Sequence, residues 1–224
     1  YESYFEDTMR AGHYKNNPDS VDVMIRSSPQ IIQDLIDFGV EFERTSDGLS
    51  YTREGAHSTF RILHHKDITG YEITSKLMVQ VQQRPHIHIE EYTSMVDIIE
   101  QDNVCTGVIV RTKDGKIQPI YAKSVVLATG GLGGLFQSST NYPHITGDAL
   151  AIALKHQIAL QDINYIQIHP TTLYSEKKGR SFLISESVRG EGAVLLNEKG
   201  ERFVDELLPR DVVTKAIKDE MKKT

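Results

Sequence analysis

Apolar residues recur at helical spacing in the N-terminal part of the chain. Four of them would share one helix face: Ile31, Ile32, Leu35 and Ile36. Ser28 suits the N-cap, Pro29 the first helical position and Gly39 the C-terminal stop. The pattern predicts an amphipathic helix between Ser28 and Gly39 that packs on a core.

The segment from Tyr51 to Gly70 shows no such periodicity. It is polar and rich in His, Arg and Thr, and we expect a long ordered loop. Loops of this length inside compact domains are more often functional than not. From Glu72 to Gln83 the pattern predicts a short helix, which Arg84-Pro85 should end because the residue before a proline disfavours helical backbone.

A β-rich stretch follows. Residues 87–99 alternate as in a strand, and the segments 104–112 and 116–121 flank Lys113-Asp114-Gly115, which is a hairpin signal. Residues 125–128 form a short, wholly apolar run that ends at Thr129-Gly130-Gly131. A strand that is apolar on both faces indicates a parallel or doubly covered sheet.

The C-terminal part changes character. Thr146 should cap a helix that runs to about Gln157, whereas residues 163–212 are irregular and dense in His, Arg, Glu and Gly. Pro209 precedes a helix expected from Asp211 onward. This order predicts an α/β domain followed by the start of a second domain.

Composition and charge narrow the function. The 224 residues include 25 Lys and Arg against 31 Asp and Glu, a net charge of −6, which argues against a nucleic-acid partner. The single cysteine, Cys105, excludes a disulfide within the chain. No apolar run reaches the roughly 18 residues of a membrane-spanning helix. The chain starts at Tyr1 and closes on an unfinished helix, so we expect an internal fragment.

The sequence disfavours a metal site and a Ser-His-Asp hydrolase site. The nine histidines do not have the spacing of a metal site, because His64 and His65 would point apart on any regular element. A Ser-His-Asp hydrolase is disfavoured because the nucleophile-elbow pattern is missing.

Three charged segments are candidates, each with a structural alternative. Arg189-Gly190-Glu191-Gly192 suggests a tight backbone that aims a charge inward, or a surface turn held by a salt bridge. Arg210, between Pro209 and a helix start, is a site residue or a capping ion pair. His169 before Pro170 is a ligand-binding or a satisfied core histidine. The glycines after residue 128 would let a dinucleotide approach the backbone, but they lack the full G-x-G-x-x-G spacing.

Taken together, the motifs resemble one family. The run Arg53-Glu54-Gly55-Ala56-His57-Ser58 and the segment Asp67-Ile68-Thr69-Gly70 resemble the substrate loop of the L-aspartate oxidases, which belong to the fumarate reductase/succinate dehydrogenase flavoproteins. Ala128-Thr129-Gly130-Gly131, His169-Pro170-Thr171, Ser185-Glu186, the Arg189 motif and Pro209-Arg210-Asp211 follow in the order of that family. The resemblance covers essentially the whole chain.

The resemblance implies a Rossmann-like FAD-binding domain over residues 1–162 and the start of an α+β capping domain over 163–224. Both would be partial, with the N-terminal dinucleotide fingerprint before Tyr1. It implies non-covalent FAD, contacted by six residues: Ser94, Met95, Thr129, Gly130, Gly131 and Asp148.

The resemblance also assigns roles at the substrate. Arg210 would donate or accept a proton, Glu54 and Arg189 would orient L-aspartate, and His169 would bind a carboxylate. Ser185 stands where relatives often have Thr, and either hydroxyl can donate to a carboxylate. By itself Arg210 suggests only charge stabilisation, because a free guanidinium is always protonated.

Elementary electrostatics agrees with these roles and favours an amino-acid substrate over the other dicarboxylates of the family. A dicarboxylate needs Arg and His donors in fixed geometry, and an amino-acid substrate adds an ammonium group that needs an anion. Glu54 supplies that anion, whereas succinate or fumarate would leave its charge unpaired.

The expected activity is therefore oxidation of L-aspartate to iminoaspartate in the cytoplasm, with oxygen or fumarate as acceptor. The product would pass to quinolinate synthase in NAD biosynthesis. The alternatives are a fumarate reductase/succinate dehydrogenase flavoprotein subunit and an inert fragment that cannot hold FAD.

Overall fold

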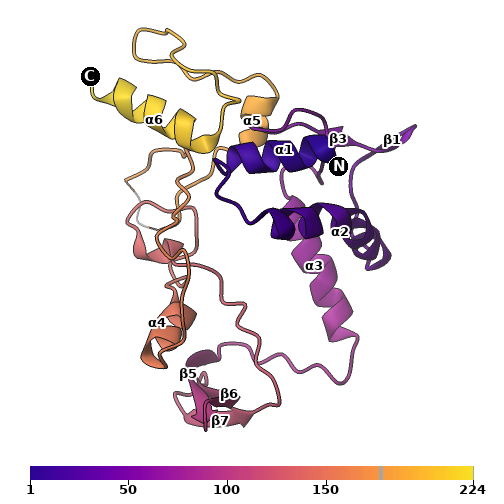
Figure 1. Ribbon diagram of the computed structural model, residues 1–224, viewed down its shortest axis with the longest axis vertical. Helices are drawn as coiled ribbons and strands as arrows, with labels where there is room; N and C mark the ends of the chain where they lie inside the picture. The colour runs from indigo at the N-terminus through magenta and orange to yellow at the C-terminus, as the bar shows by residue number, and fades with distance from the viewer. Residues whose placement is uncertain (177–178, 224) are drawn as a thin grey trace. The chain divides into compact units, whose positions relative to one another are not determined.

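The computed structural model describes residues 1–176 and 179–223 and divides into two compact units. The first unit comprises Tyr1–Ile87, Gln167–Thr171 and Ile184–Thr224, and the second comprises His88–Ile166 and Thr172–Leu183. Helices and strands both occur, as expected for an α/β chain (Figure 1). The domain boundary after residue 162 stays a prediction.

The first unit begins with helices α1 (Glu2–Ala11) and α2 (Pro18–Asp37). Their contact forms a small core of Met9, Val21 and Ile25. The side chain of Asn17 caps α2 by accepting a hydrogen bond from the Ser20 amide at 3.0 Å. The N-cap signal therefore lies at Asn17-Pro18.

The predicted helix start at Ser28-Pro29 is wrong, because Pro29 lies inside α2. Proline has no N–H to donate to the carbonyl four residues earlier. The hydroxyl of Ser28 donates to that carbonyl instead, at 2.8 Å from the Ile25 oxygen. The predicted stop is confirmed, since α2 ends at Asp37 and Gly39 has a positive φ of 94°.

Short strands frame the polar segment after α2. Strands β1 (Arg44–Thr45) and β2 (Gly48–Leu49) pair, as do β3 (Tyr51–Thr52) and β4 (Ile62–Leu63), all antiparallel. The loop predicted over 51–70 is confirmed for 53–61 and 64–68, which contain no helix or strand. It is wrong at β3 and β4 and from Thr69, where helix α3 begins.

Three further helices complete the first unit: α3 (Thr69–Gln82), α5 (Glu186–Gly190) and α6 (Arg210–Met221). Helix α3 confirms the predicted helix and its end before Arg84-Pro85. Helix α6 starts directly after Pro209, one residue earlier than expected.

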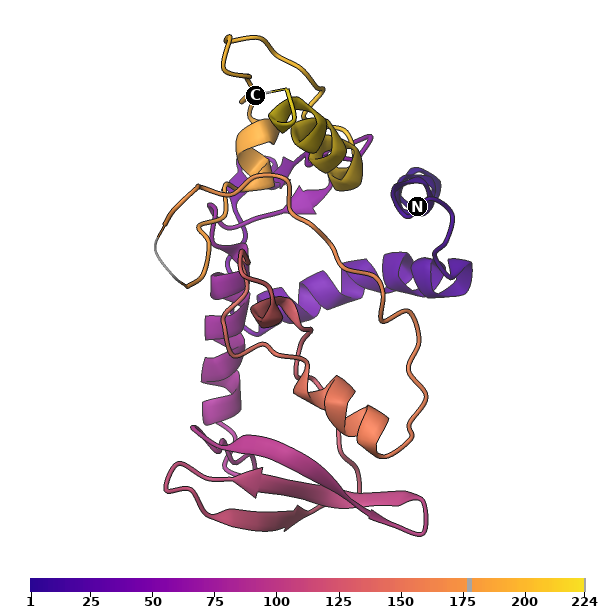
Figure 2. The ribbon, with the colours of Figure 1, turned by 90° about the vertical axis from the view of Figure 1, so that its left-hand side faces the viewer.

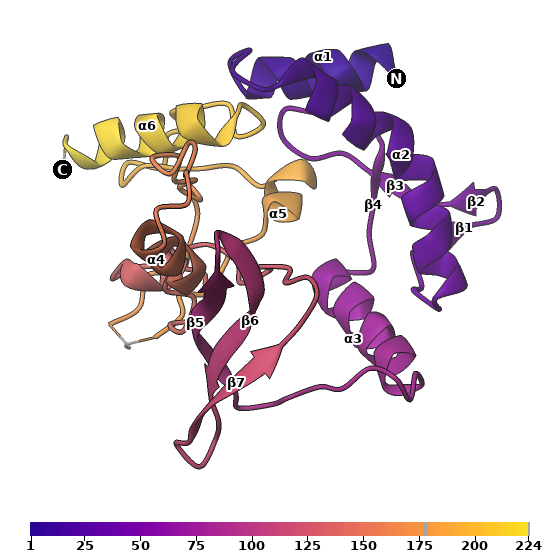
Figure 3. The ribbon, with the colours of Figure 1, turned by 60° about the horizontal axis from the view of Figure 1, so that its bottom comes forward.

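The second unit contains an antiparallel sheet in the order β5-β6-β7. Its strands are β5 (Ser94–Gln101), β6 (Val104–Arg111) and β7 (Ile117–Tyr121). The predicted hairpin at Lys113-Asp114-Gly115 is confirmed by the pairing of β6 with β7. Helix α4 (Asp148–Lys155) lies on the β5 side of this sheet, as Figures 2 and 3 show.

Two expectations in this unit are wrong. Residues 125–128 form no strand among the described residues, and Val126 is 86% exposed. A strand needs a hydrogen-bonded neighbour, and no described segment pairs with this run. Helix α4 is capped by Gly147, in a left-handed conformation with φ of 76°, and not by Thr146. The Thr146 hydroxyl donates to the Asp148 carboxylate at 2.6 Å.

No helix in the described part of the chain is long and apolar enough to cross a membrane.

Candidate active site

The loop 53–58 is held by contacts along its length. Arg53 Nε donates to the His57 carbonyl at 2.8 Å, and the Ala56 amide donates to the Leu207 carbonyl at 3.2 Å. Ala56 takes a left-handed conformation with φ of 65°, which is uncommon for a residue with a Cβ. The loop therefore has a defined conformation against the segment before α6.

Two glycines let this loop approach helix α5. A Cβ on Gly55 would lie 2.3 Å from Oε1 of Glu186, and a Cβ on Gly190 would lie 2.8 Å from the Arg53 carbonyl oxygen. Real Cβ contacts are not this short. Gly55 and Gly190 thus allow the loop 53–58 and helix α5, which are distant in sequence, to pack closely.

Helix α5 brings two charged side chains into the interior. Ser185 caps the helix by accepting from the Ser187 amide at 3.3 Å. Glu186 and Arg189 are only 7% and 4% exposed, and their charged groups lie 3.7 Å apart. Arg189 Nη1 donates to the Glu206 carbonyl at 2.8 Å. Within the described residues, its Nε and Nη2 are buried without a hydrogen-bond partner.

Arg210 reaches the same carboxylate from the start of α6. Its Nε donates to Glu186 Oε2 at 2.6 Å, and its Nη1 donates to Gln167 Oε1 at 3.0 Å. Glu186 therefore lies between two arginines and balances part of their charge. The residue patterns do not identify Glu186 as a site residue. The one signal in the sequence is its place between Ser185 and Arg189 in a segment rich in His and Arg.

The charges of Arg210, Arg189 and Glu186 act on His169. Burial lowers its pKa below the usual 6.5, as do the charges of Arg210 and Arg189, although the Thr171 carbonyl and Glu186 oppose them. His169 is therefore neutral at pH 7. Its Nδ1 lies 3.0 Å from the Thr171 carbonyl oxygen and 3.3 Å from the Thr171 amide. When Nδ1 accepts from that amide, Nε2 carries the proton and can donate to a carboxylate.

Glu54 lies half-buried in the loop and has no hydrogen-bond partner for its carboxylate among the residues that the structure describes. Its charge acts on His57, where it opposes the burial and the Arg61 charge that lower the pKa of this histidine. The carboxylate is thus available to a cationic group.

The first unit thus brings together Arg189, Arg210, His169 and Ser185 around Glu186, with the Glu54 loop packed on them. Two guanidinium groups and one buried carboxylate leave a net positive charge, and a neutral histidine and a hydroxyl add donors. This arrangement can bind carboxylates in fixed geometry.

The candidate cofactor residues lie in the second unit. The Gly134 amide donates to the Ile145 carbonyl at 2.8 Å, which places the glycine-rich segment beside the start of α4 and Asp148. At the other end of α4, Lys155 donates to Asp97, and His156 Nε2 lies 2.7 Å from Asp97 Oδ1. These contacts attach α4 to β5, the strand that carries Ser94 and Met95.

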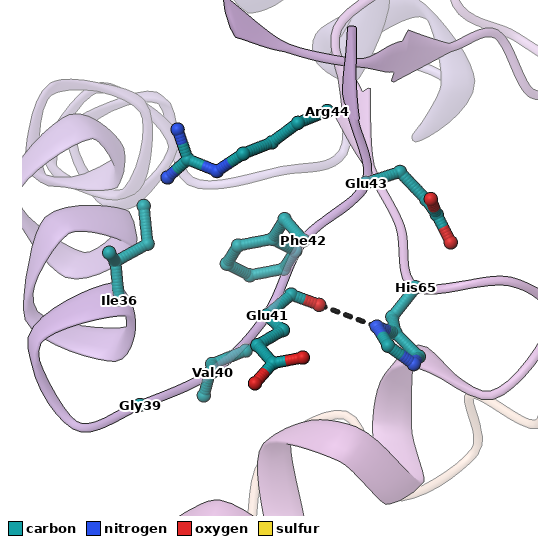
Figure 4. Close-up of a pocket in the computed structure, with 8 residues that line it drawn as sticks. All are labelled: Ile36, Gly39, Val40, Glu41, Phe42, Glu43, Arg44 and His65. Atoms are coloured by element: carbon teal, nitrogen blue, oxygen red, sulfur yellow. Dashed lines mark hydrogen bonds between the residues drawn. The ribbon is translucent and has the colours of Figure 1, made fainter.

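A separate hollow of about 460 Å³ lies in the first unit, between the end of α2 and β1 (Figure 4). Its lining includes Phe42, Glu43, Arg44 and His65. None of the predicted site residues lines it. No cluster of three or more metal-ligand side chains occurs in the ranges 1–176 and 179–223.

Residues 1–224 match the family model described as "FAD binding domain". The chain belongs to this FAD-binding family. The family implies FAD as cofactor.

The residues present fit such a cofactor. Thr129, Gly130 and Gly131 are exposed, and a Cβ on Gly131 would meet nothing within 4 Å. A ring or a phosphate can therefore approach the backbone there. Asp148 adds an exposed carboxylate at the start of α4, which can accept from a hydroxyl group.

The curated relatives of the chain include two L-aspartate oxidases. The chain is 52% identical over 225 residues to an L-aspartate oxidase of Clostridium perfringens, covering 100% of this chain and 51% of that protein. It is 49% identical to an L-aspartate oxidase of Clostridium acetobutylicum, covering 98% of this chain and 51% of that protein. The chain thus spans about half the length of these relatives.

Solved structures share the fold. The E. coli quinol fumarate reductase chain FrdA, in a mutant form, matches with a TM-score of 0.91 and 29% identity over 99% of this chain and 41% of that chain. Sdh1 of Mycobacterium smegmatis matches with a TM-score of 0.80 and 35% identity over 98% and 40%. The expected flavoprotein fold class is confirmed.

Proposed function

We propose that the complete protein is an FAD-dependent L-aspartate oxidase that converts L-aspartate to iminoaspartate. The two Clostridium relatives that carry this name support the proposal. The structural observation that carries the dicarboxylate part of the proposal is the buried guanidinium of Arg189, and Glu54 favours L-aspartate within that class. The Nε and Nη2 of Arg189 lack hydrogen-bond partners among the described residues, and the carboxylate of Glu186 links this guanidinium to Arg210.

Most of the hydrogen-bond donors around Glu186 suit the two carboxylates of the substrate. Unpartnered buried donors are costly, so a carboxylate that accepts from Arg189 gains the full benefit of a charge-assisted hydrogen bond. His169 Nε2 and the Ser185 hydroxyl add neutral donors. Together these groups orient a dicarboxylate and exclude water from it.

The substrate ammonium accounts for Glu54. An ionised carboxylate without a partner in a half-buried loop is best stabilised by a cation from the ligand. L-aspartate supplies this cation, and succinate does not.

FAD, when bound, accepts the electron pair and the hydrogen removed from the substrate. Arg210 holds a proton at its guanidinium beside the substrate position. Because a free guanidinium is always protonated, a role in proton transfer requires an adjacent group that exchanges the proton. Glu186, 2.6 Å from Arg210 Nε, is placed to take that proton, which leaves Arg210 able to accept the proton that the substrate ammonium loses on oxidation.

The rest of the proposal concerns the whole protein. FAD is held non-covalently, its contacts including Ser94, Met95, Thr129–Gly131 and Asp148. The FAD-binding domain covers residues 1–162, and the capping domain begins at 163. Oxygen or fumarate reoxidises the flavin, and iminoaspartate passes to quinolinate synthase in NAD biosynthesis, in the cytoplasm.

The decisive assay measures peroxide release by the complete protein with L-aspartate and with succinate. We expect robust turnover of L-aspartate and little of succinate. The reverse preference would overturn the proposal. A Glu54→Gln variant should lose most of its discrimination between the two substrates, and unchanged discrimination would remove Glu54 from the argument.

A fumarate reductase/succinate dehydrogenase flavoprotein subunit is the second candidate, which the structural match to FrdA favours. It predicts succinate or fumarate turnover without aspartate oxidation in the same assay.

The remaining alternative is that the 224-residue chain alone is an inert fragment that cannot hold FAD. A flavin absorbance spectrum of the purified chain distinguishes a competent cofactor site from an inert fragment.

A further inference from the structure

Asp7 is a buried carboxylate in helix α1 that the sequence patterns did not single out. It is 6% exposed. A buried carboxylate needs strong partners, because the loss of hydration is otherwise uncompensated. All the partners that the structure gives Asp7 lie about 50 residues away along the chain, at the end of the substrate loop 53–58 and just beyond it.

Ser58 makes two hydrogen bonds to Asp7. Its amide donates to Asp7 Oδ2 at 2.8 Å, and its hydroxyl donates to the same oxygen at 2.6 Å. Arg61 Nη1 pairs with this oxygen at 2.8 Å, and Arg61 Nη2 donates to the Ser58 hydroxyl at 3.2 Å. One carboxylate oxygen therefore fixes both the backbone and the side chain of the last loop residue.

Helix α1 contacts the loop at a second point on the same face. Tyr4 precedes Asp7 by three residues, so both project from one side of the helix. The Tyr4 ring lies 6.0 Å from the His57 ring, and the Arg61 guanidinium lies 4.8 Å from the Tyr4 ring centre. Figure 3 shows the connection between β3 and β4 running toward α1.

The charge state of Asp7 suits this role. Burial acts to raise the pKa of Asp7, but the hydrogen bonds from Ser58 and the charge of Arg61 outweigh it, so the pKa lies below its usual value. Asp7 is therefore ionised at neutral pH, and its bonds to Ser58 are charge-assisted.

The loop that Asp7 anchors also carries Glu54. The same loop passes close to Glu186 at Gly55, and the Ala56 amide donates to the Leu207 carbonyl. Glu54 thus lies in a short segment held at Ala56 by one part of the chain and at Ser58 by another.

We infer that Asp7 is a positioning residue for substrate binding: through Ser58 and Arg61 it holds the loop 53–58 where Glu54 can meet the substrate ammonium. This inference rests on the proposed function for the identity of the substrate. The hydrogen bonds and the ion pair of the Asp7 carboxylate go to Ser58 and Arg61 and not to Glu54, Arg189 or Arg210.

The test uses the complete FAD-loaded protein with Asp7→Asn, which keeps the shape and removes the charge. Glu2→Gln is the matched control, because Glu2 is exposed on the same helix. We expect the KM for L-aspartate to rise about tenfold or more in Asp7→Asn, as for the loss of a charge-assisted bond. The kcat and the FAD content should change little. The control should match the wild type.

A readout that needs no turnover is trypsin cleavage after the exposed Arg53. Cleavage should be faster in Asp7→Asn than in Glu2→Gln. An unchanged KM and an unchanged cleavage rate would overturn the inference. So would a parallel loss of FAD content and kcat at unchanged KM, because that pattern indicates a general structural role.

Ser58→Ala is the second variant, and it carries the test if Asp7→Asn does not fold. It removes one of the two Ser58 bonds and should raise the KM in the same direction by a smaller factor. An unchanged KM in Ser58→Ala would also contradict the inference. If the wild type does not oxidise L-aspartate but cleavage after Arg53 still depends on Asp7, the proposed function fails and the anchoring of the loop remains.

Discussion

Glu186 and Arg210 form a bond of 2.6 Å across 24 residues of sequence, and the same carboxylate lies 3.7 Å from Arg189. The pair joins the start of α5 to the start of α6. It also explains why two arginines can lie near each other in a largely buried setting, since unpaired charges there would be strongly destabilising.

Glu186→Gln should lower kcat while FAD binding is preserved. The amide keeps the size of the side chain but cannot exchange a proton with Arg210 or balance its charge. Loss of a hydrogen bond between charged groups costs about 1.5–3 kcal/mol, which corresponds to a fall of roughly 10- to 150-fold. Steady-state kinetics and the flavin spectrum measure the two effects. Glu198→Gln, at an exposed position, is the control, and equal effects of both variants would contradict the prediction.

Gly55→Ala should weaken substrate binding and lower the free energy of unfolding by about 1–3 kcal/mol. The new Cβ would lie 2.3 Å from Glu186 Oε1, and Arg210 holds that carboxylate in place. Gly70→Ala is the matched control, because Gly70 lies in α3 with nothing within 4 Å of a new Cβ. We expect it to be stabilising by about 0.5–1 kcal/mol. Chemical unfolding of both variants checks this contrast, and the KM of Gly55→Ala checks the effect on substrate binding.

His169 should make stability depend on pH just below neutrality. Its folded pKa lies below the usual 6.5, chiefly because of burial. The unfolded chain therefore binds the proton more readily, and the contribution of His169 is fully present above 6.5 and declines as the pH falls toward the folded value. The melting temperature of His169→Gln should fall less between pH 7.5 and about 5.5 than that of the wild type. His86→Gln, at an exposed position, should keep the wild-type slope.

Asp97→Asn should loosen helix α4 from strand β5. Hydrogen bonds from Lys155 and His156 lower the pKa of Asp97 from 3.8 to about 2. Its contribution to stability is thus present above pH 3.8 and is lost as the pH falls toward about 2. We expect a lower melting temperature and weaker FAD binding, followed by flavin fluorescence, because Asp148 and Ser94 lie on the two elements. Asp102→Asn, in the exposed β5–β6 turn, should leave both unchanged.

Several elements could be read from nearby residues alone. The end of α2 just before Gly39, the helix before Arg84-Pro85 and the hairpin around Asp114 all follow from local propensity and turn chemistry. Their hydrogen bonds close within a few residues or between adjacent strands, so distant parts of the chain hardly influence them.

Other features were set by distant partners. Residues 125–128 have the composition of a buried strand, yet no described segment pairs with them. Pro29 resembles a helix start, but the Ser28 hydroxyl replaces the missing amide and the packing of Val21 and Ile25 on α1 keeps the helix continuous.

The sequence by itself determined the family motifs, their order and the residue types of the site, including Glu54, Arg189, His169 and Arg210. Only the tertiary structure revealed that Glu186 joins the two arginines and that Asp7 anchors the loop. Both are buried carboxylates whose partners lie far along the chain. Burial and pairing depend on which segments meet in space. Residue type and spacing along the chain do not show which segments meet.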